Sequence, residues 1–335
     1  MNKNLFEVIV VGTMSAGKST MLNALIGKEL LHSANEATTA TITRIHDKDG
    51  ENKFSGAAYN YENELIEKSR SIDFEVLKHW NTDPEIKLIE ITGDIKTIYN
   101  TEAELVIYDL PGPNNSQDDN HENLTMEVID NNEYGLIFYV LNATQIGVND
   151  DRSLLEKIKN SLQKDNHKDI VFVLNKADQL DEEKGESLSA AIKNVEKYLT
   201  NIGFEQPKII ATSANMALLL QKLINQEDLS RRENMQISVC DFKTLSNLSE
   251  SELLSINNFI NESCQEYLVE ENTSPEDKRT LQEKYYQMGF GAICYFLQKE
   301  INHYNHLAAE SVSLDKLKVF IGQLIMYYLK KSTMI

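Results

Sequence analysis

The sequence predicts an α/β protein in which a doubly wound, mostly parallel sheet is flanked by helices and followed by a C-terminal helical part. Three observations support this fold class. Apolar runs of strand length alternate with helix-spaced segments up to about residue 215, and such alternation places helices on both faces of a parallel sheet. A glycine-rich loop at residues 12–19 joins the first strand to the first helix. Beyond residue 215, only helical segments are apparent.

The first elements follow from composition and spacing. Residues 5–11 form a largely apolar, β-branched run, and residues 19–30 carry apolar side chains at helical spacing. A second strand is expected at 40–46. A turn at 47–50 follows it, and residues 53–59 are expected to return as the second strand of a hairpin.

The middle of the chain continues the alternation. Residues 62–80 are expected to form a helix because apolar side chains recur along them, with Trp80 at its end as a core residue. Further strands are expected at 87–92, 104–109, 135–141, 169–174 and 207–212, and helices at 119–131, 150–164 and 182–200.

The C-terminal part has a different pattern. An acidic, turn-rich loop is expected at 270–278, with helices at 279–304 and 313–331. The chain is therefore expected to consist of an α/β core at 1–215, a mostly helical insertion or extension at 216–284, and C-terminal helices at 285–335.

Residues 12–19 read Gly-Thr-Met-Ser-Ala-Gly-Lys-Ser, a complete phosphate-binding loop between a strand and a helix. Backbone N–H groups of such a loop surround phosphates, and the helix N-terminus favours negative charge. Lys18 is expected to reach the β- and γ-phosphates, and Ser19 to ligate Mg²⁺. The alternative, a glycine turn with a surface lysine, is disfavoured by the flanking strand and helix. The expected phosphate-binding residues of the loop are Met14, Ser15, Ala16, Gly17, Lys18, Ser19 and Thr20.

A second motif, D-x-x-G, is formed by Asp109 and Gly112 after an apolar strand. An aspartate at that position can hold Mg²⁺ through a water molecule, and the glycine N–H can meet the γ-phosphate. The alternative is an ordinary strand exit into a Pro-Gly turn. The order of the motifs along the chain favours phosphate and metal binding.

A third motif, N-K-x-D, is formed by Asn175, Lys176 and Asp178. A carboxylate there can accept hydrogen bonds from guanine N1–H and the exocyclic amine, a donor pair that adenine lacks, so the motif selects GTP over ATP. Lys176 is expected to lie along the base and Asn175 to brace the loops. The alternative for Asp178 is a helix N-cap.

Two shorter signals complete the set. Ser213 and Ala214 follow the strand at 207–212 and match a T-S-A segment whose backbone N–H reads guanine O6. Thr39, with Thr38 as the alternative, is expected to complete the Mg²⁺ shell and to position the attacking water. These threonines would otherwise be β-branched residues that open a strand.

The bulk composition limits the function classes. A net charge of −19 argues against binding to nucleic acid, which requires a basic face, and disfavours broad adhesion to anionic lipid. The three cysteines are widely spaced and form no disulfide framework, which favours a reducing cytoplasm. The N-terminus has no secretory-signal pattern.

The motif series resembles that of translation-factor-class GTPases and, within them, the dynamin superfamily, bacterial members in particular. Three details carry the resemblance: Ser15 in the phosphate loop, the D-L-P-G-P-N sequence at 109–114, and Ala143-Thr144-Gln145 after the strand at 135–141. In dynamins the serine helps to hold a monovalent cation in place of an arginine finger.

The resemblance implies a Mg²⁺-dependent GTPase with K⁺ or Na⁺ in the active site, and with Ser15, Lys18 and Thr39 as catalytic residues. The implied metal ligands are Ser19, Thr39 and Asp109. It also implies a homodimer formed through the G domain, with GTP and GDP as ligands. Residues 1–215 would be the GTPase core, and 285–335 would hold its last helix and the start of a helical bundle.

Two departures from the family pattern keep a second function open. Met14 stands where dynamins often place a water-orienting glutamine, and the chain lacks a long stalk, so it is either a minimal relative or a fragment. The alternative is a slow GTP-state switch that regulates a protein partner. A protein partner or a membrane would be contacted through regions outside this chain, in the cytoplasm or at the membrane periphery. The acidic charge disfavours an Era-like RNA-associated GTPase.

Overall fold

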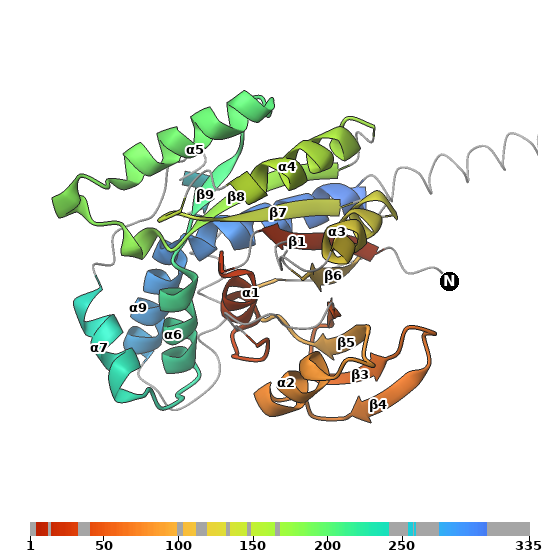
Figure 1. Cartoon of the computed structure of the whole chain (residues 1–335). Coiled ribbons are helices and arrows are strands. Elements are labelled where there is room, and N and C mark those ends of the chain that lie inside the picture. Colours follow the sequence, from red (N-terminus) through yellow and green to blue (C-terminus); the bar gives the residue numbers. More distant parts are fainter. Residues whose placement is uncertain are drawn as a thin grey trace, which may run out of the picture.

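The computed structural model contains one continuous sheet flanked by helices (Figure 1). In the described part of the chain, nine strands lie in the order β4-β3-β5-β2-β6-β1-β7-β8-β9. The structure describes residues 5–12, 15–32, 41–98, 103–111, 119–131, 135–145, 149–164, 168–240, 254–256, 258 and 275–306. The strands are β1 (Leu5–Gly12), β2 (Ile42–Asp47), β3 (Ser55–Tyr59), β4 (Leu65–Ser69), β5 (Leu88–Gly93), β6 (Glu104–Asp109), β7 (Gly135–Asn142), β8 (Lys168–Asn175) and β9 (Ile209–Ala211).

The sheet has a parallel half and a mixed half. Strands β6, β1, β7, β8 and β9 are parallel to one another. Strand β2 runs antiparallel to β6, and β5, β3 and β4 continue the sheet beyond it. The predicted mostly parallel α/β fold is therefore confirmed, and the mixed half is an extension on one side of it.

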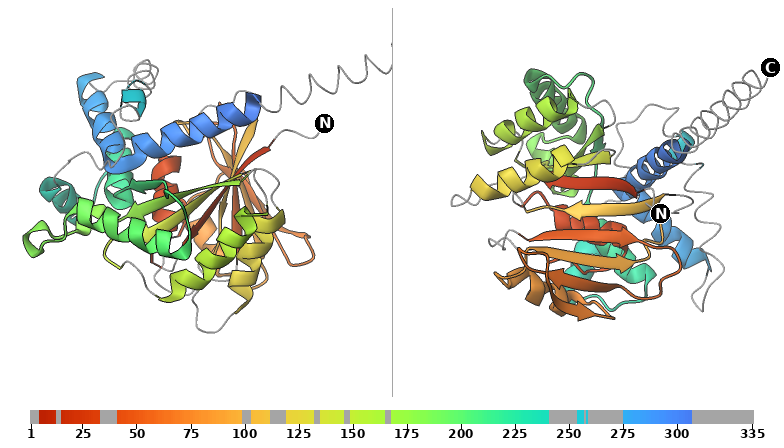
Figure 2. Two further views of the ribbon diagram at one scale, coloured as in Figure 1. Left: turned by 90° about the horizontal axis from the view of Figure 1, so that it is seen from above. Right: turned by 90° about the vertical axis from the view of Figure 1, so that its right-hand side faces the viewer.

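Helices cover both faces of the sheet (Figures 1 and 2). Alternation along β1 shows why, because Val8 and Val10 enter one core cluster while Ile9 and Val11 enter the other. Helices α1, α2, α6 and the C-terminal helix contribute to the first cluster, and α3, α4 and α5 to the second. The helices are α1 (Lys18–Ile26), α2 (Phe74–Thr82), α3 (Asp119–Asn131), α4 (Asn149–Leu162), α5 (Leu188–Ile202), α6 (Ala214–Ile224), α7 (Arg231–Val239) and α9 (Pro275–Tyr285).

The expected helix at 62–80 is wrong in its first half. Residues 65–69 form strand β4, and α2 begins only at Phe74. The side chain of Asn60 accepts hydrogen bonds from the N–H groups of Glu62 and Glu64, which fixes a tight turn between β3 and β4. This local turn prevails over the helical spacing. Trp80 is buried as expected, at 1% exposure, and donates to Glu67 of β4 at 2.6 Å.

The pairing expected for residues 53–59 is also wrong. Strand β3 pairs with β4 and β5, whereas β2 pairs with β5 and β6. The hairpin thus forms with the following segment, because its turn lies at 60–64 and not at 47–50. Similarly, α5 begins at Leu188 after a break at Gly185, which has φ +82°, later than the expected start at 182.

The C-terminal helix starts earlier than expected. Residues 275–278, which were expected in a loop, are already helical, with Pro275 at the first helical position, where its missing N–H carries no penalty. Helix α9 passes into a π-helical turn, η3 (Tyr286–Phe290), and residues 291–306 continue as an α-helix. Figure 2 shows the two helical segments meeting at a bend. The helix expected at 313–331 lies outside the described residues.

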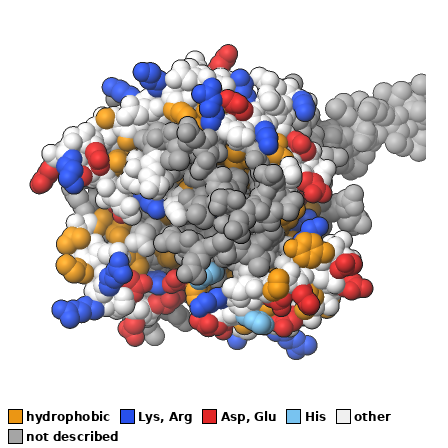
Figure 3. Space-filling view, viewed as in Figure 1, with side chains coloured by type: hydrophobic (Ala, Val, Ile, Leu, Met, Phe, Trp, Pro, Cys, Tyr) orange, Lys and Arg blue, Asp and Glu red, His pale blue; other side chains and the backbone are white. Residues whose placement is uncertain are grey.

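One face of the molecule carries both acidic and basic side chains on its described residues. Acidic and basic side chains are interspersed over the face seen in Figure 3. Among the described residues, no helix combines the length and the apolar character needed to cross a bilayer.

Candidate functional site

The phosphate-binding loop joins β1 to α1 in a conformation that depends on Gly17. This residue caps the helix with φ +92°, in the left-handed region. A Cβ atom there would overlap the side-chain amide of Asn175. Ser15 also has a positive φ of 62°. The Nζ of Lys18 donates to the carbonyl of Gly12 at 3.0 Å, so the ammonium group lies over its own loop.

Ser19, in the first turn of α1, lies beside Asp109 at the end of β6. The Ser19 hydroxyl donates to Asp109 Oδ2 at 3.0 Å, because parallel pairing brings the ends of β1 and β6 together. Burial raises the pKa of the Asp109 carboxyl above its ordinary value, while Lys18 and the Ser19 hydrogen bond act in the opposite direction. A hydroxyl and a carboxylate at this spacing form an oxygen pair of the kind that Mg²⁺ prefers.

Asn175 connects three loops through one buried side chain. Its Nδ2 donates to the carbonyl of Ala16 in the phosphate-binding loop at 2.9 Å. Its Oδ1 accepts from the Thr212 hydroxyl at 3.2 Å and from the N–H of Ala214 at 3.0 Å. With the residue only 2% exposed, these hydrogen bonds are shielded from water. The predicted bracing role of Asn175 has this geometric basis.

Asp178 is held by the loop that follows β9. The Ser213 hydroxyl donates to Asp178 Oδ1 at 2.6 Å. Lys176 adopts the left-handed conformation, with φ +64°, and leads into the 3₁₀ turn η1 (Ala177–Gln179), which contains Asp178. The Asp178 side chain is exposed, so its carboxylate is accessible from solvent.

The N–H groups at the start of the loop after β9 form hydrogen bonds within the protein. The N–H of Ser213 donates to the carbonyl of Met288 at 3.1 Å, and that of Ala214 donates to Asn175. The next amides belong to the first turn of α6, which has no helical acceptor for them. The contact with Met288 is one that sequence reasoning missed. Its only signal was a glycine at 289 inside a helical pattern.

The predicted site residues fall into two groups. The structure brings together the loop from Ser15 to Thr20, Asp109, and the two loops that hold Asp178 and Ser213, all at the carboxyl ends of parallel strands. Met14, Thr38, Thr39 and Gly112 lie outside the described residues.

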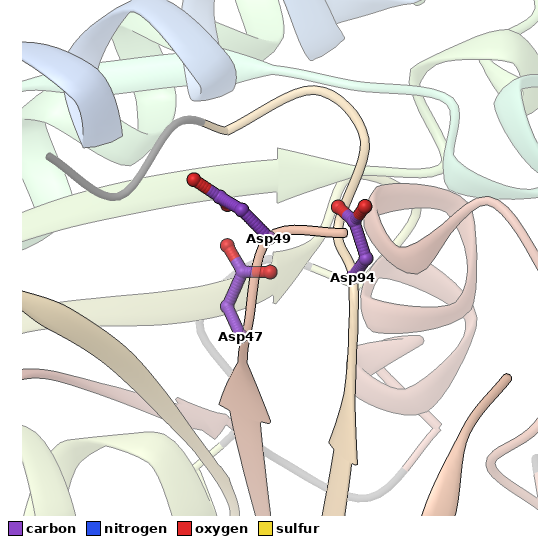
Figure 4. Close-up of side chains that lie close together, drawn as sticks. All are labelled: Asp47, Asp49 and Asp94. Atoms are coloured by element: carbon purple, nitrogen blue, oxygen red, sulfur yellow. The ribbon is translucent and has the colours of Figure 1, made fainter. Parts of the chain in front are cut away.

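An acidic cluster lies where β2 and β5 terminate, at the end of the strands that lies away from Asp109. Figure 4 shows its three side chains. The carboxylates of Asp47, Asp49 and Asp94 have oxygen atoms within 4.8 Å of one another. Asp47 accepts from the N–H of Ile95 at 2.7 Å, and Asp94 accepts from the N–H of Gly50 at 3.0 Å. Because β2 is antiparallel to β6, this cluster is remote from Asp109, and its contacts fasten the turns after β2 and β5.

A model of the Dynamin family matches residues 8–177, just over half of the chain. The chain belongs to the dynamin family. The resemblance drawn from the motif series is thereby confirmed. The matched region extends from β1 through the N-K-x motif of a dynamin-family G domain, and it includes Ser15, Ser19, Asp109 and Asn175.

The proteins that this dynamin-family chain matches are longer than the chain. It is 25% identical over 244 residues to an uncharacterised protein from the xynA 3′ region of Caldicellulosiruptor sp. (strain Rt8B.4), covering 71% of this chain and 56% of that protein. Two solved structures of an oligomerised bacterial dynamin pair, described as a mechanism for long-range sensing and tethering of membranes, align with a TM-score of 0.50. Their identity is 18%, over 99% of this chain and 47% of theirs. The chain thus spans about half the length of these relatives, and the structural likeness concerns the fold.

Proposed function

We propose that this dynamin-family chain binds Mg²⁺·GTP and hydrolyses it to GDP and phosphate. The observation that carries the proposal is the side chain of Asn175, which links the phosphate-binding loop at Ala16 to the loop of Ser213 and Ala214. A single buried residue that fixes both loops favours one ligand with phosphates at one end and a base at the other.

The base of that ligand is proposed to be guanine. The Asp178 carboxylate would accept from N1–H and the 2-amino group, and its position is supported by the Ser213 hydroxyl. Lys176 would lie along the base, and Ala214 would line it at the start of α6. Because the N–H groups of Ser213 and Ala214 already donate within the protein, the amides that follow Ala214 in the first turn of α6 are the better donors to guanine O6.

The proposed metal ligands are Ser19, Asp109 and Thr39. The oxygen pair of Ser19 and Asp109, 3.0 Å apart, suits a hard divalent cation. When bound, Mg²⁺ neutralises charge on the β- and γ-phosphates. Burial raises the pKa of Asp109, which is consistent with a carboxylate whose charge is balanced by a bound cation.

Catalysis by this chain would consist of positioning and charge neutralisation. Lys18 would exchange its hydrogen bond with the Gly12 carbonyl for phosphate oxygens. The amides from Met14 to Thr20 and that of Gly112 would surround the phosphates. Thr39 would hold the attacking water, and Ser15 would help to bind K⁺ or Na⁺ at the bridging oxygen.

Assembly and location follow as further parts of the proposal. We infer a homodimer across the nucleotide face, which would order the residues around the γ-phosphate, and a cytoplasmic protein that reaches a membrane or a protein partner through regions outside this chain. The related structures are described as an oligomerised pair that tethers membranes, which supports this inference. The proposed parts are the GTPase core at 1–215, a helical insertion or extension at 216–284, and C-terminal helices at 285–335.

A second candidate is a GTP-state switch with little turnover. Met14 favours it, because a thioether cannot orient a water molecule as an amide does. In that case the chain would bind GTP with the same residues but would release its partner, and not perform mechanical work, when the γ-phosphate is lost.

One experiment separates the two candidates. GTP hydrolysis would be measured with the full chain at several protein concentrations, in K⁺ and in a larger inert cation, with Lys18→Ala as the inactive control. The dynamin-type mechanism predicts turnover per molecule that rises with protein concentration and with K⁺. Turnover that stays flat with both would support the switch. Absence of any difference between the wild type and Lys18→Ala would overturn the GTPase proposal itself.

A further inference from the structure

One short stretch of the C-terminal helix is hydrogen-bonded both to the loop after β9 and to α1, the helix that follows the phosphate-binding loop. The carbonyl of Met288 accepts from the N–H of Ser213 at 3.1 Å. Three residues earlier, the hydroxyl of Tyr285 donates to the carbonyl of Ala24 at 3.1 Å. Ser213, in the loop after β9 (residues 212–214, the base loop), supports Asp178, and Ala24 belongs to α1, the helix that begins at the phosphate-binding lysine.

The helix departs from regular geometry where it meets the base loop. Within η3, Met288 has φ −72° and ψ 19°, and Gly289 has φ 88° and ψ −7°. Irregular turns of this kind within helices are frequent at functional sites. The bend therefore coincides with the residue whose carbonyl holds Ser213.

Gly289 is required by both conformation and space. Its positive φ is unfavourable for a residue with a side chain. A Cβ atom at this position would overlap the carbonyl of Ala211 and lie 2.8 Å from Cγ2 of Thr212. These two residues immediately precede Ser213. The absence of a side chain at Gly289 therefore allows the helix to pack directly against the start of the base loop.

The contact is fully enclosed. Tyr285 and Phe290 are 0% exposed and Met288 is 1% exposed. The Tyr285 and Phe290 rings lie 5.1 Å apart between centroids. A displacement of this helical stretch would have to move closely packed side chains, and it would change the support of Ser213 directly.

We propose that residues 285–289 are a positioning element for the guanine-binding loop. They hold the Ser213 backbone, and the Ser213 hydroxyl holds the Asp178 carboxylate. The position of the C-terminal helix is thereby linked to the selectivity for the base. This inference rests on the proposed recognition of guanine and names the residues that regulate it. Met288 and Gly289 act through Ser213 and do not touch the nucleotide.

The first test compares Gly289→Ala with Gly50→Ala in the full chain. Gly50 has φ +83°, close to that of Gly289, but no atom lies within 4 Å of the position of its Cβ, so it controls for backbone strain. Dissociation constants would be measured with fluorescent GDP and fluorescent ADP. We expect Gly289→Ala to reduce the preference for GDP over ADP about tenfold, the effect of one lost hydrogen bond. Gly50→Ala should retain the wild-type ratio.

The outcomes distinguish this inference from the proposed function. If wild-type protein binds ADP as tightly as GDP, guanine recognition and the inference fail together. If the wild type selects GDP and Gly289→Ala selects it equally well, only the inference is overturned, even if the variant unfolds at a lower temperature. A merely structural role would weaken the binding of both nucleotides in proportion and leave their ratio unchanged.

A measurement on wild-type protein covers the case in which Gly289→Ala does not fold. Hydrogen–deuterium exchange would be followed with and without GDP. We expect amides within residues 285–293 to exchange about fivefold more slowly when GDP is bound, because the base loop and the helix then stabilise each other. Protection confined to the phosphate-binding loop, with unchanged exchange in 285–293, would overturn the inference.

Discussion

The side chain of Asn175 donates a 2.9 Å hydrogen bond to the carbonyl of Ala16, a residue 159 positions earlier in the chain. This contact joins the end of β8 to the phosphate-binding loop. It also explains why the neighbouring residue is Gly17, since any side chain there would displace the asparagine amide. The two loops of the proposed nucleotide site are therefore held to each other by one side chain.

Replacement of Asn175 by alanine should lower the stability of the fold. The change leaves the Ala16 carbonyl, the Thr212 hydroxyl and the Ala214 N–H without their partner. We expect the free energy of unfolding to fall by about 3 kcal/mol, since buried unsatisfied polar groups cost about 1–3 kcal/mol each. Urea denaturation would measure it. Asn225→Ala is the matched control, because it removes one exposed hydrogen bond, to the carbonyl of Gly27. Equal losses for the two variants would contradict the bracing role.

Replacement of Asp178 by asparagine should change the preferred base. A carboxylate accepts two N–H donors from guanine, whereas an amide can donate to the C2 carbonyl of xanthine. We expect the variant to lose affinity for GDP about a hundredfold or more and to prefer XDP, because such sites reject a base that leaves polar groups unpaired. Competition binding with fluorescent nucleotides would measure this. Asp181→Asn, which alters an exposed ion pair with Lys184, should bind GDP as the wild type does.

Replacement of Asp109 by asparagine should separate metal binding from stability. Burial raises the pKa of this carboxyl, which means that the charged form is disfavoured in the metal-free fold. The neutral asparagine should therefore not lower the melting temperature in the absence of Mg²⁺. The Mg²⁺ concentration needed for GTP binding should rise about tenfold or more. A variant that melts at a much lower temperature without metal would argue against this assignment, because it would reveal a structural role for the charge.

Glu233 should make stability depend on acidity. The hydrogen bond from Ser230 and then that from Lys222 lower the pKa of Glu233 from 4.5 to about 2. A carboxylate with a depressed pKa contributes stability that is fully present above its unfolded value and is lost as the pH falls toward its folded value. Glu233→Gln should therefore melt below the wild type at pH 7, with a difference that narrows between about pH 4.5 and pH 2. Thermal melts across this range would test it. A constant difference would exclude this linkage.

Sequence reasoning predicted the parts of the fold that depend on residue type. The parallel half of the sheet was predicted because apolar runs of strand length alternate with helix-spaced segments, an alternation that is typical of parallel strands. The β3–β4 hairpin was missed because the turn made by Asn60 outweighs the helical spacing of the residues that follow. The contact between Ser213 and Met288 could not be predicted, because it joins two main-chain groups and its only trace in the sequence is the neighbouring Gly289.

Trp80 is the only tryptophan of the chain, and its place in the sheet makes it a selective optical reporter. It is buried on α2 and hydrogen-bonded to β4, and β5, β2 and β6 lie between β3 and β1, the strand that leads into the phosphate-binding loop. Its fluorescence therefore records the melting of the outer, mixed half of the sheet. Compared with a signal from bound nucleotide, it would reveal whether the two halves unfold together or one after the other.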